Sequence, residues 1–287
     1  EQWWKVTQWF MEETHDKGKN KLADNEQKLR QQFELFESFF TTIVQRFYDT
    51  VDKLDEILTE ANPRQVEQAI ALLIHPQHFN YFFNHLQNPK WIKPLKNKGF
   101  FQNPPQVVKD TNQGTISFPT WLQSCYLARM AAFDPNAVFE IAQEIKTDNP
   151  RVHEDFVDAA LQMPPEVAVQ LVRKVKTWIE APYFLDLLAD KIGALIVHLA
   201  KGGQVKKALD LARSLLVVKK DHNNEKAEDN ETYLSSPKPR ILMDNWHYRE
   251  ILKKYVLQLP ELVKVAGEDE TDVLKMLVFL LFDAVQY

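Results

Sequence analysis

Glycine and cysteine are scarce in this sequence of 287 residues, which contains seven glycines and a single cysteine, Cys125. Nucleotide-binding folds hold phosphate groups on glycine-rich loops, because glycine lets the backbone approach the phosphates closely. Neither a GxGxxG nor a GxxxxGKS/T pattern occurs in the chain. A single cysteine excludes an intramolecular disulfide bond and a cysteine-rich zinc site, and it suits a reducing compartment.

Long apolar runs and a strong excess of one charge are also missing. No apolar run reaches the roughly 18 residues that a membrane-spanning helix needs, and the N-terminal residues do not resemble a signal peptide. The chain carries 35 basic and 40 acidic residues, for a net charge of −5, which is not typical of a dedicated nucleic-acid-binding protein. We therefore expect a cytoplasmic protein with no membrane-spanning segment.

Proline is regularly spaced in the middle of the chain, at Pro119, Pro135, Pro150, Pro165 and Pro182, with apolar residues at helical spacing between. Proline fits the first turn of a helix, where its missing N–H is not needed. Each step therefore predicts one short helix, and two steps predict a helical hairpin of about 31 residues, which is typical of α-solenoids. The predicted helices are 119–132, 135–146, 150–162, 165–179, 182–200 and 203–218.

A long helix is predicted before this region. From Leu22 to Leu58, apolar residues recur at steps of mostly three and four, which is nearly a heptad pattern over about 40 residues. Phenylalanine at four of these positions is unusual for a free two-stranded coiled coil, so a helix packed on the solenoid or on a partner fits better. A free parallel dimer remains the alternative.

Shorter elements flank the regular region. A first amphipathic helix is predicted at 2–16. Asn62-Pro63 and Asn88-Pro89 predict helix starts, and Gly99 predicts a helix end. Residues 100–118 predict a non-helical insertion, either a small β-hairpin around Asn112-Gln113-Gly114 or an ordered loop. Residues 219–240 are polar and charged and predict a disordered insertion. Further predicted helices lie at 64–75, 77–87, 244–258, 260–266 and 270–286.

The expected fold class is therefore all-α. It is an α-solenoid of stacked, HEAT-like helical hairpins, with a long N-terminal helix and one small non-helical insertion. Two regions are predicted, an N-terminal helical segment at 1–61 and a helical-repeat domain at 62–287. The last fifteen residues are almost entirely apolar, whereas a solenoid normally ends on a polar capping helix, so we expect a piece of a larger protein.

No motif in the chain predicts catalysis, a cofactor or a metal. His75, His78 and His85 lie close together in sequence, but a zinc site needs further converging ligands. His153-Glu154-Asp155 lacks the HExxH spacing that places two imidazoles on one helix face. Arg151 and Asp155 have the i, i+4 spacing of a surface ion pair. Cys125 lies among apolar residues, as a small buried side chain does.

Basic and aromatic residues form a stronger signal. Lysine and arginine neutralise phosphates and aromatic rings stack on bases, so a shared surface would predict nucleic-acid contact. The alternative is that the lysines only solvate outward helix faces. The candidate contacts are Lys90, Lys93, Lys96, Lys98, Arg173, Lys174, Lys206 and Lys207.

Several sequence segments carry a family resemblance. They are Asn88 to Pro105, Phe118-Pro-Thr-Trp121, Tyr126 to Met130, Asp148 to Val152 and Lys201 to Leu209. Over about residues 63–287 the chain resembles a helical-repeat region of large bacterial multidomain proteins, which often lies beside a signalling ATPase or another effector and in some cases is linked to antiviral defence. The resemblance implies a scaffold or sensor role and no active-site residue.

The functional hypothesis from sequence is a non-catalytic scaffold or sensor module that mediates protein–protein interaction, with a nucleic-acid-binding sensor as the alternative. The expected partner is another protein or domain of the same complex. Aromatic residues dominate interface energetics, so those in and around the 100–118 insertion are the candidate anchors, unless they form the local core. These anchors are Trp91, Phe100, Phe101 and Trp121.

Overall fold

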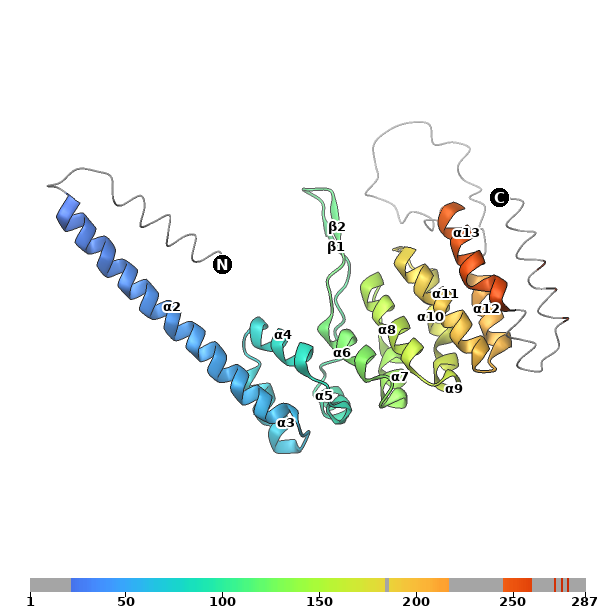
Figure 1. Cartoon of the computed structure of the whole chain (residues 1–287), viewed down its shortest axis with the longest axis horizontal. Coiled ribbons are helices and arrows are strands. Elements are labelled where there is room, and N and C mark those ends of the chain that lie inside the picture. Colours follow the sequence, from blue (N-terminus) through green and yellow to red (C-terminus); the bar gives the residue numbers. More distant parts are fainter. Residues whose placement is uncertain are drawn as a thin grey trace. The chain divides into compact units, whose positions relative to one another are not determined.

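The computed structural model describes residues 22–183, 186–216 and 245–259, together with 271, 275 and 278. These residues are mostly helical, with one small two-stranded sheet, which confirms the all-α prediction (Figure 1). The chain divides into two compact units, residues 1–56 and 57–287. The predicted helices at 2–16 and 260–266, most of that at 270–286, and the predicted disordered insertion at 219–240 lie outside the described residues. No described helix is both long enough and apolar enough to cross a membrane.

The long helix predicted for the first unit is present as α2, Leu22–Leu58. At about 1.5 Å per residue it measures roughly 55 Å. Val51 and Leu54, near its C-terminal end, are buried. Farther toward the N-terminus, large apolar side chains are exposed, as the exposed fractions of 54% for Phe36 and 65% for Phe39 illustrate.

The second unit opens with short helices, two of which begin at a proline. Helix α3 is Pro63–Leu72, and Asn62 caps it in a capping box with Gln65. Helix α4 is Pro76–His85. A single 3₁₀ turn at Pro89–Trp91 leads into α5, Ile92–Asn97. Gly99 follows with a φ of +79°, the left-handed conformation that glycine favours after a helix.

The proline spacing marks three helix starts correctly in the next region. Helix α7 is Pro135–Glu144 and α8 is Pro150–Gln162. The helix predicted at 165–179 consists of α9, Pro165–Ala168, a 3₁₀ turn at 169–171, and α10, Val172–Ile179. The remaining helices are α6 at Leu122–Met130, α11 at Asp186–Lys201, α12 at Val205–Leu216 and α13 at Asn245–Lys254.

Two proline positions differ from the prediction. Helix α6 begins three residues after Pro119, because the carbonyl of Pro119 accepts a hydrogen bond from the Asn149 side chain and Trp121 is extended. The described part of α11 begins four residues after Pro182. These prolines therefore precede their helices instead of lying in the first turn.

The helices of the second unit contact one another in two series. In the first, α4, α6, α8, α11 and α13 follow one another, each in contact with the next. In the second, α3 contacts α5, α5 contacts α7, α7 contacts α9, and α10 contacts α12. Contacts of α8 with α10 and of α11 with α12 join the two series, and the order of the labels along the second unit can be followed in Figure 1. The core therefore runs between the two series.

Aromatic rings fill the N-terminal part of this core. Phe82 and Phe83 of α4 are fully buried and meet edge to face, with ring centroids 5.1 Å apart. Trp91 packs on Phe82 at 5.4 Å, and Tyr126 of α6 packs on Phe83 at 6.2 Å. Aromatic contacts of this kind stabilise a fold beyond the area that they bury. The rings thus join α4 to α6.

Candidate partner-binding site

A short β-hairpin stands between α5 and α6. Strand β1, Val108–Asp110, pairs antiparallel with β2, Thr115–Ser117, in the register Lys109 opposite Ile116. The Asp110 carboxylate stabilises the turn, because it accepts hydrogen bonds from the backbone N–H groups of Asn112, at 2.9 Å, and Gln113, at 3.1 Å. Gly114, with a φ of +63°, completes it. Of the two predicted alternatives, a hairpin or an ordered loop, the structure has the hairpin.

The hairpin carries almost no core of its own. All strand residues except the half-buried Asp110 are exposed, and the two aliphatic side chains Val108 and Ile116 have exposed fractions of 52% and 43%. A two-stranded hairpin by itself is marginally stable in water. Its conformation must therefore be fixed at its base.

The base is fixed by the loop between α7 and α8. The Asn149 side chain is fully buried and donates hydrogen bonds to the carbonyls of Pro105, at 3.3 Å, and Pro119, at 2.8 Å. These carbonyls belong to the two ends of the hairpin segment, so one amide joins them. The Thr147 hydroxyl also donates to the Pro105 carbonyl, at 2.8 Å, and the Val107 N–H donates to the Asp148 carboxylate.

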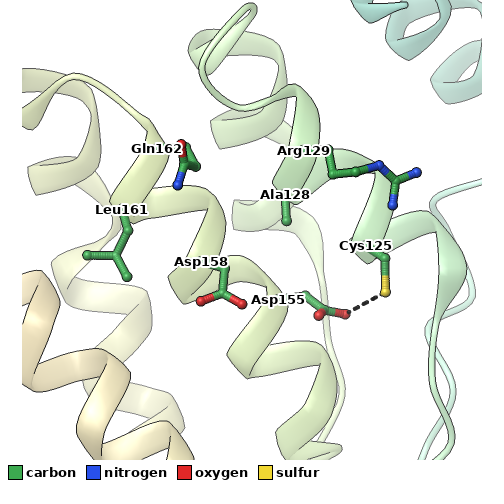
Figure 2. Close-up of a pocket in the computed structure, with 7 residues that line it drawn as sticks. All are labelled: Cys125, Ala128, Arg129, Asp155, Asp158, Leu161 and Gln162. Atoms are coloured by element: carbon green, nitrogen blue, oxygen red, sulfur yellow. Dashed lines mark hydrogen bonds between the residues drawn. The ribbon is translucent and has the colours of Figure 1, made fainter. Parts of the chain in front are cut away.

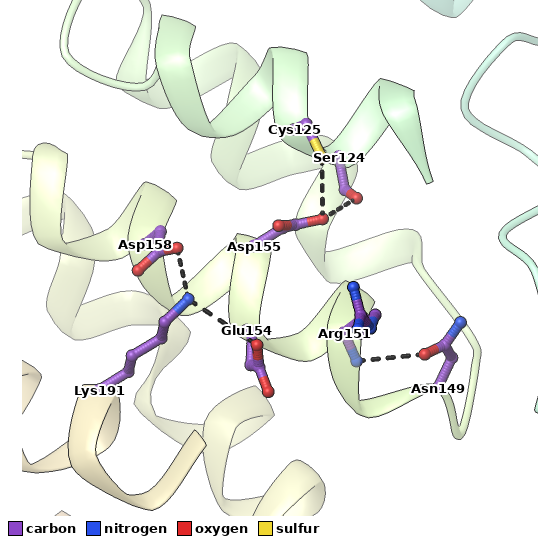
Figure 3. Close-up of polar contacts among 8 residues, drawn as sticks. All are labelled: Ser124, Cys125, Asn149, Arg151, Glu154, Asp155, Asp158 and Lys191. Atoms are coloured by element: carbon purple, nitrogen blue, oxygen red, sulfur yellow. Dashed lines mark hydrogen bonds and ion pairs between the residues drawn. The ribbon is translucent and has the colours of Figure 1, made fainter. Parts of the chain in front are cut away.

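Asn149 is also the N-cap residue of α8. Its side-chain oxygen accepts a hydrogen bond from the backbone N–H of Arg151 at 3.1 Å (Figure 3). Asparagine is a preferred N-cap because its oxygen satisfies an N–H group that has no partner within the helix. The same side chain therefore starts a helix and closes the hairpin base.

One side of the hairpin meets the segment before α11. Phe118 packs edge to face on Tyr183, with ring centroids 5.7 Å apart. The Lys109 ammonium lies 5.5 Å from the centre of the same ring, a cation–π distance. These contacts involve Lys109 and Phe118 of the hairpin segment and leave residues 111–117 exposed.

An open groove lies between α6 and α8. Its volume is about 520 Å³, and it is lined by Cys125, Ala128, Arg129, Asp155, Asp158, Leu161 and Gln162 (Figure 2). Arg129 donates a hydrogen bond to the carbonyl of Phe83, in the last turn of α4. The groove thus presents an arginine, two carboxylates, an amide and aliphatic carbon on one surface.

Asp155 connects the two helices at this groove. Its carboxylate accepts hydrogen bonds from the Ser124 hydroxyl and, at 3.5 Å, from the Cys125 thiol (Figures 2 and 3). Burial raises the pKa of Asp155, and these two hydrogen bonds oppose the rise. The surface ion pair expected with Arg151 is replaced by these contacts with α6.

Cys125 does not have the properties of an activated nucleophile. Burial and the neighbouring Asp155 charge raise the pKa of its thiol to about 11. Reactive cysteines have a lowered pKa, because the thiolate is the nucleophile. The Cys125 thiol is therefore protonated at neutral pH and serves as a hydrogen-bond donor.

Ion pairs continue this polar contact from helix to helix. The Lys191 ammonium of α11 lies 2.7 Å from Asp158 and 3.9 Å from Glu154, both on α8 (Figure 3). Asp190 of α11 contacts the end of α13, where Lys254 lies 3.0 Å from its carboxylate. The hydroxyl of Tyr255, the residue after α13, donates a hydrogen bond to the same carboxylate at 2.8 Å. Such partly exposed pairs each contribute little stability, so their main effect is to specify which helices meet.

The four aromatic residues predicted as partner anchors lie mainly in the core. Trp91 is fully buried, Phe101 and Trp121 are buried, and Phe100 is half-buried. The Trp91 indole N–H donates to the carbonyl of Leu58 at 3.3 Å, and the Phe100 ring stacks on Phe79. Their role in partner binding stays a prediction, and their packing agrees with the core alternative.

Three of the eight predicted basic contacts are engaged within the fold. Lys96 pairs with Glu140 and Glu144, each at 3.2 Å, and Lys98 pairs with Glu67. Lys174 donates to the carbonyl of Ile145, at the C-terminal end of α7, and burial, reinforced by Lys146, lowers its pKa. The other five are exposed and form no ion pair among the described residues: Lys90, Lys93, Arg173, Lys206 and Lys207.

The candidate histidines do not converge on a site. His75 and His85 are exposed at the two ends of α4, and His78 is buried. His153 is buried against the Trp178 ring, with centroids 5.1 Å apart, and its Nε2 donates to the carbonyl of Thr147. Within the described residues, no three side chains of the metal-binding types come together.

Sequence reasoning missed the two hydrogen bonds by which the Asn149 side chain joins Pro105 to Pro119, which we call the Asn149 clamp. It also missed the contacts of Asp155 and Lys191. The Asn149-Pro150 signal revealed the helix cap, but no sequence pattern pairs residues separated by 30 or more positions. Comparison with known proteins found no matching family model, no similar curated protein and no similar solved structure.

Proposed function

We propose that this chain is a non-catalytic helical-repeat scaffold that binds a partner protein through the β-hairpin and the adjoining α6–α8 groove. The observation that carries the proposal is the clamped hairpin. Its strands are exposed and lack a core, yet Asn149 ties both ends of the segment to the helices. An exposed element on a rigid base suits recognition, because little conformational entropy is lost when a partner binds it.

The two series of helices support the finer fold proposal, an α-solenoid of stacked hairpins. In the first series each helix contacts the next member of the series, and in the second the contacts run from α3 to α9 and again from α10 to α12, as in stacked repeats. A recurring contact strengthens this interpretation. Arg129, Lys174 and His198 each donate a hydrogen bond to a carbonyl in the last turn or C-cap of an earlier helix of the same series. Helix C-termini leave carbonyls without partners, so each unit completes the one before it.

The sequence resemblance extends the proposal to the larger protein that contains this chain and to its location in the cell. A scaffold or sensor region within a larger bacterial signalling or antiviral-defence protein, in the cytoplasm, would present such a hairpin to another protein or domain of the same complex. The protonated Cys125 thiol and the ion-paired carboxylates near the groove agree with a binding surface.

A three-way affinity purification tests the proposal. The wild-type chain is compared with a hairpin variant, Val108→Ser together with Ile116→Ser, and with the control Phe133→Ser, whose side chain is 70% exposed in the α6–α7 loop. We expect a protein that the wild type and the control retain and the hairpin variant loses. The purified protein must then bind the hairpin variant at least about tenfold more weakly, as the loss of roughly 1.4 kcal/mol implies. Equal binding to all three chains would refute the hairpin's role.

Nucleic-acid binding is the second candidate, supported by the five exposed basic residues that form no ion pair among the described residues. Affinity for a generic duplex and a generic single strand is measured at rising salt. The phosphate contribution is strongest at low salt, so absence of binding there rejects this function. If binding occurs, Lys206→Gln with Lys207→Gln should reduce the salt dependence.

A further inference from the structure

One carboxylate of the α6–α8 groove has no counter-ion within the described part of the chain. Asp155 accepts its two hydrogen bonds from neutral groups, the Ser124 hydroxyl and the Cys125 thiol, and forms no ion pair with a described residue. A charge removed from water is costly unless an opposite charge compensates it, and burial raises the pKa of Asp155 accordingly. The groove therefore stabilises a positive charge placed beside this carboxylate.

The nearest ammonium group is already shared by other carboxylates. Lys191 of α11 lies 2.7 Å from Asp158 and 3.9 Å from Glu154, and it favours the ionised form of Asp155 only from a longer distance. Asp158 acts in the opposite sense and disfavours that form. Three carboxylates of α8 thus face a single ammonium, which leaves an excess of negative charge at the groove.

Charged groups on the other helices that pack on α8 are engaged elsewhere or exposed. Arg129 of α6 donates to a carbonyl in the last turn of α4. Two lysines of α10 contact the end of α7 and α12, and two further charged residues of α9 and α10 are exposed. These four residues are Lys174, Lys176, Glu166 and Arg173.

The hydrogen bonds of Asp155 favour lysine over arginine as the source of the positive charge. Those from Ser124 and Cys125 both end on Oδ2, which leaves Oδ1 for a guest. Arginine binds a carboxylate best as a fork on both oxygens, whereas a lysine ammonium is a compact charge that needs only one. A lysine side chain therefore fits this carboxylate better.

The groove also has room for a long aliphatic stem. Its volume of about 520 Å³ lies within the range of small-ligand sites, and Ala128 and Leu161 line it with aliphatic carbon (Figure 2). Lysine packs its stem on such carbon while its ammonium reaches polar groups. Asp155, Asp158 and Gln162 follow one another at steps of three and four and share one face of α8. The three N–H donors of an ammonium match these three acceptors.

We propose that the α6–α8 groove binds a lysine side chain of the partner protein, with the ammonium against Asp155 and Asp158 and the stem against Leu161. This inference rests on the proposed function, in which the groove belongs to the partner-binding surface, and it adds the chemistry that the partner presents there. The ammonium needs an ionised carboxylate, so a proton and the lysine compete for Asp155.

The competition gives the pH dependence a definite sign. Lysine binding should weaken as the pH falls through the titration of Asp155. Because burial raises the pKa of Asp155, this loss should begin at a pH above the ordinary aspartate value of about 3.9. Conversely, a bound lysine should move the titration midpoint of Asp155 to lower pH.

NMR titration of the full chain with three peptides tests the guest. They are short alanine peptides, blocked at both ends, that carry one lysine, norleucine or arginine at the centre. The lysine peptide should shift the amide signals of residues 125–129 and 155–162, with a Kd of about 1 mM or weaker at neutral pH. Norleucine keeps the stem without the charge and should bind at least about tenfold more weakly, and arginine should also bind more weakly than lysine.

Two variants separate the charge of Asp155 from general electrostatics. Asp155→Asn keeps the shape of the side chain and should weaken the lysine peptide at least about tenfold and remove the pH dependence. Glu180→Gln removes the same charge at an exposed position after α10 and should leave the Kd unchanged. Urea unfolding shows that both variants are folded. Carbon-13 titration of the Asp155 carboxyl in the wild type, with and without each peptide, measures the competition without any substitution.

Four results would overturn the proposal. The first is the absence of shifts at the groove with about 20 mM lysine peptide. The second is binding of the norleucine or arginine peptide as tight as that of lysine. The third is an unchanged Kd in Asp155→Asn, and the fourth is an Asp155 midpoint that the lysine peptide does not move.

These outcomes are distinct from a failure of the proposed function, because the peptide titrations use no partner protein. A partner that the hairpin variant loses but Asp155→Asn binds as tightly as the wild type does would retain the proposed function and overturn the lysine site.

Discussion

Replacement of Asn149 tests the central structural element of the proposed binding site. Its buried amide donates to the carbonyls of Pro105 and Pro119, and its oxygen caps α8 at Arg151. Asn149→Ala removes all three hydrogen bonds. Asn149→Ser keeps a capping hydroxyl but is too short to join the two carbonyls. The two variants therefore separate the cap from the clamp.

The magnitude follows from the three contacts. A lost N-cap costs about 1 kcal/mol, and each buried hydrogen bond contributes about 1 kcal/mol. We therefore expect Asn149→Ala to lower the free energy of unfolding by about 3 kcal/mol. Asn149→Ser should lower it by about 2 kcal/mol, because serine is itself a good N-cap.

Urea unfolding measures the global effect, and hydrogen exchange of the amides at 106–119 measures the local one. The exchange should accelerate in both variants, because the hairpin has no core to hold it once its base opens. Asn136→Ala, at an exposed position in the first turn of α7, is the control and should change neither. A loss below about 0.5 kcal/mol for Asn149→Ala, or unchanged exchange at the hairpin, would refute the clamp.

Three further predictions concern the core. Burial lowers the pKa of His153 to about 4, so the folded state resists protonation, and stability should fall by up to about 3 kcal/mol as the pH drops from 6.5 to 4. Denaturation of His153→Phe at both pH values should show a smaller loss. A Cβ atom on Gly193 would lie 2.2 Å from the Tyr255 ring. Gly193→Ala should therefore cost about 1–3 kcal/mol and accelerate hydrogen exchange in α13. Trp91→Ala should cost about 3–5 kcal/mol in thermal or urea unfolding, as expected of a core residue, and an unchanged stability would favour a surface role.

Much of the helix pattern could be predicted because its signals are local. Asn62-Pro63, Asp134-Pro135 and Asn149-Pro150 mark helix starts, and in each the Asx side chain accepts a hydrogen bond from the following helix, as the sequence implies. The heptad spacing of α2 and the turn at Gly114 are likewise set by neighbouring residues. Helix α6 starts later than its proline predicts, since a distant side chain, Asn149, bonds to Pro119.

The candidate site was less predictable because burial and pairing depend on the whole fold. Trp91 and Trp121 are of a residue type that often anchors interfaces, but in this structure both side chains are buried in the core. Lys96 and Lys174 count as positive charge in the sequence, whereas in the structure one pairs with two glutamates and the other caps a helix. Only three-dimensional contact distinguishes a free cation from an engaged one.

The sequence by itself determined where helices begin, where the chain turns and which helix faces are apolar, because those properties arise from backbone geometry and spacing within a few residues. The tertiary structure decided which polar groups meet. Ser124 and Asp155, Asp158 and Lys191, and Asp190 and Lys254 are separated by 31, 33 and 64 positions. No local rule brings such pairs together, since their contact follows from the packing of one helix on the next.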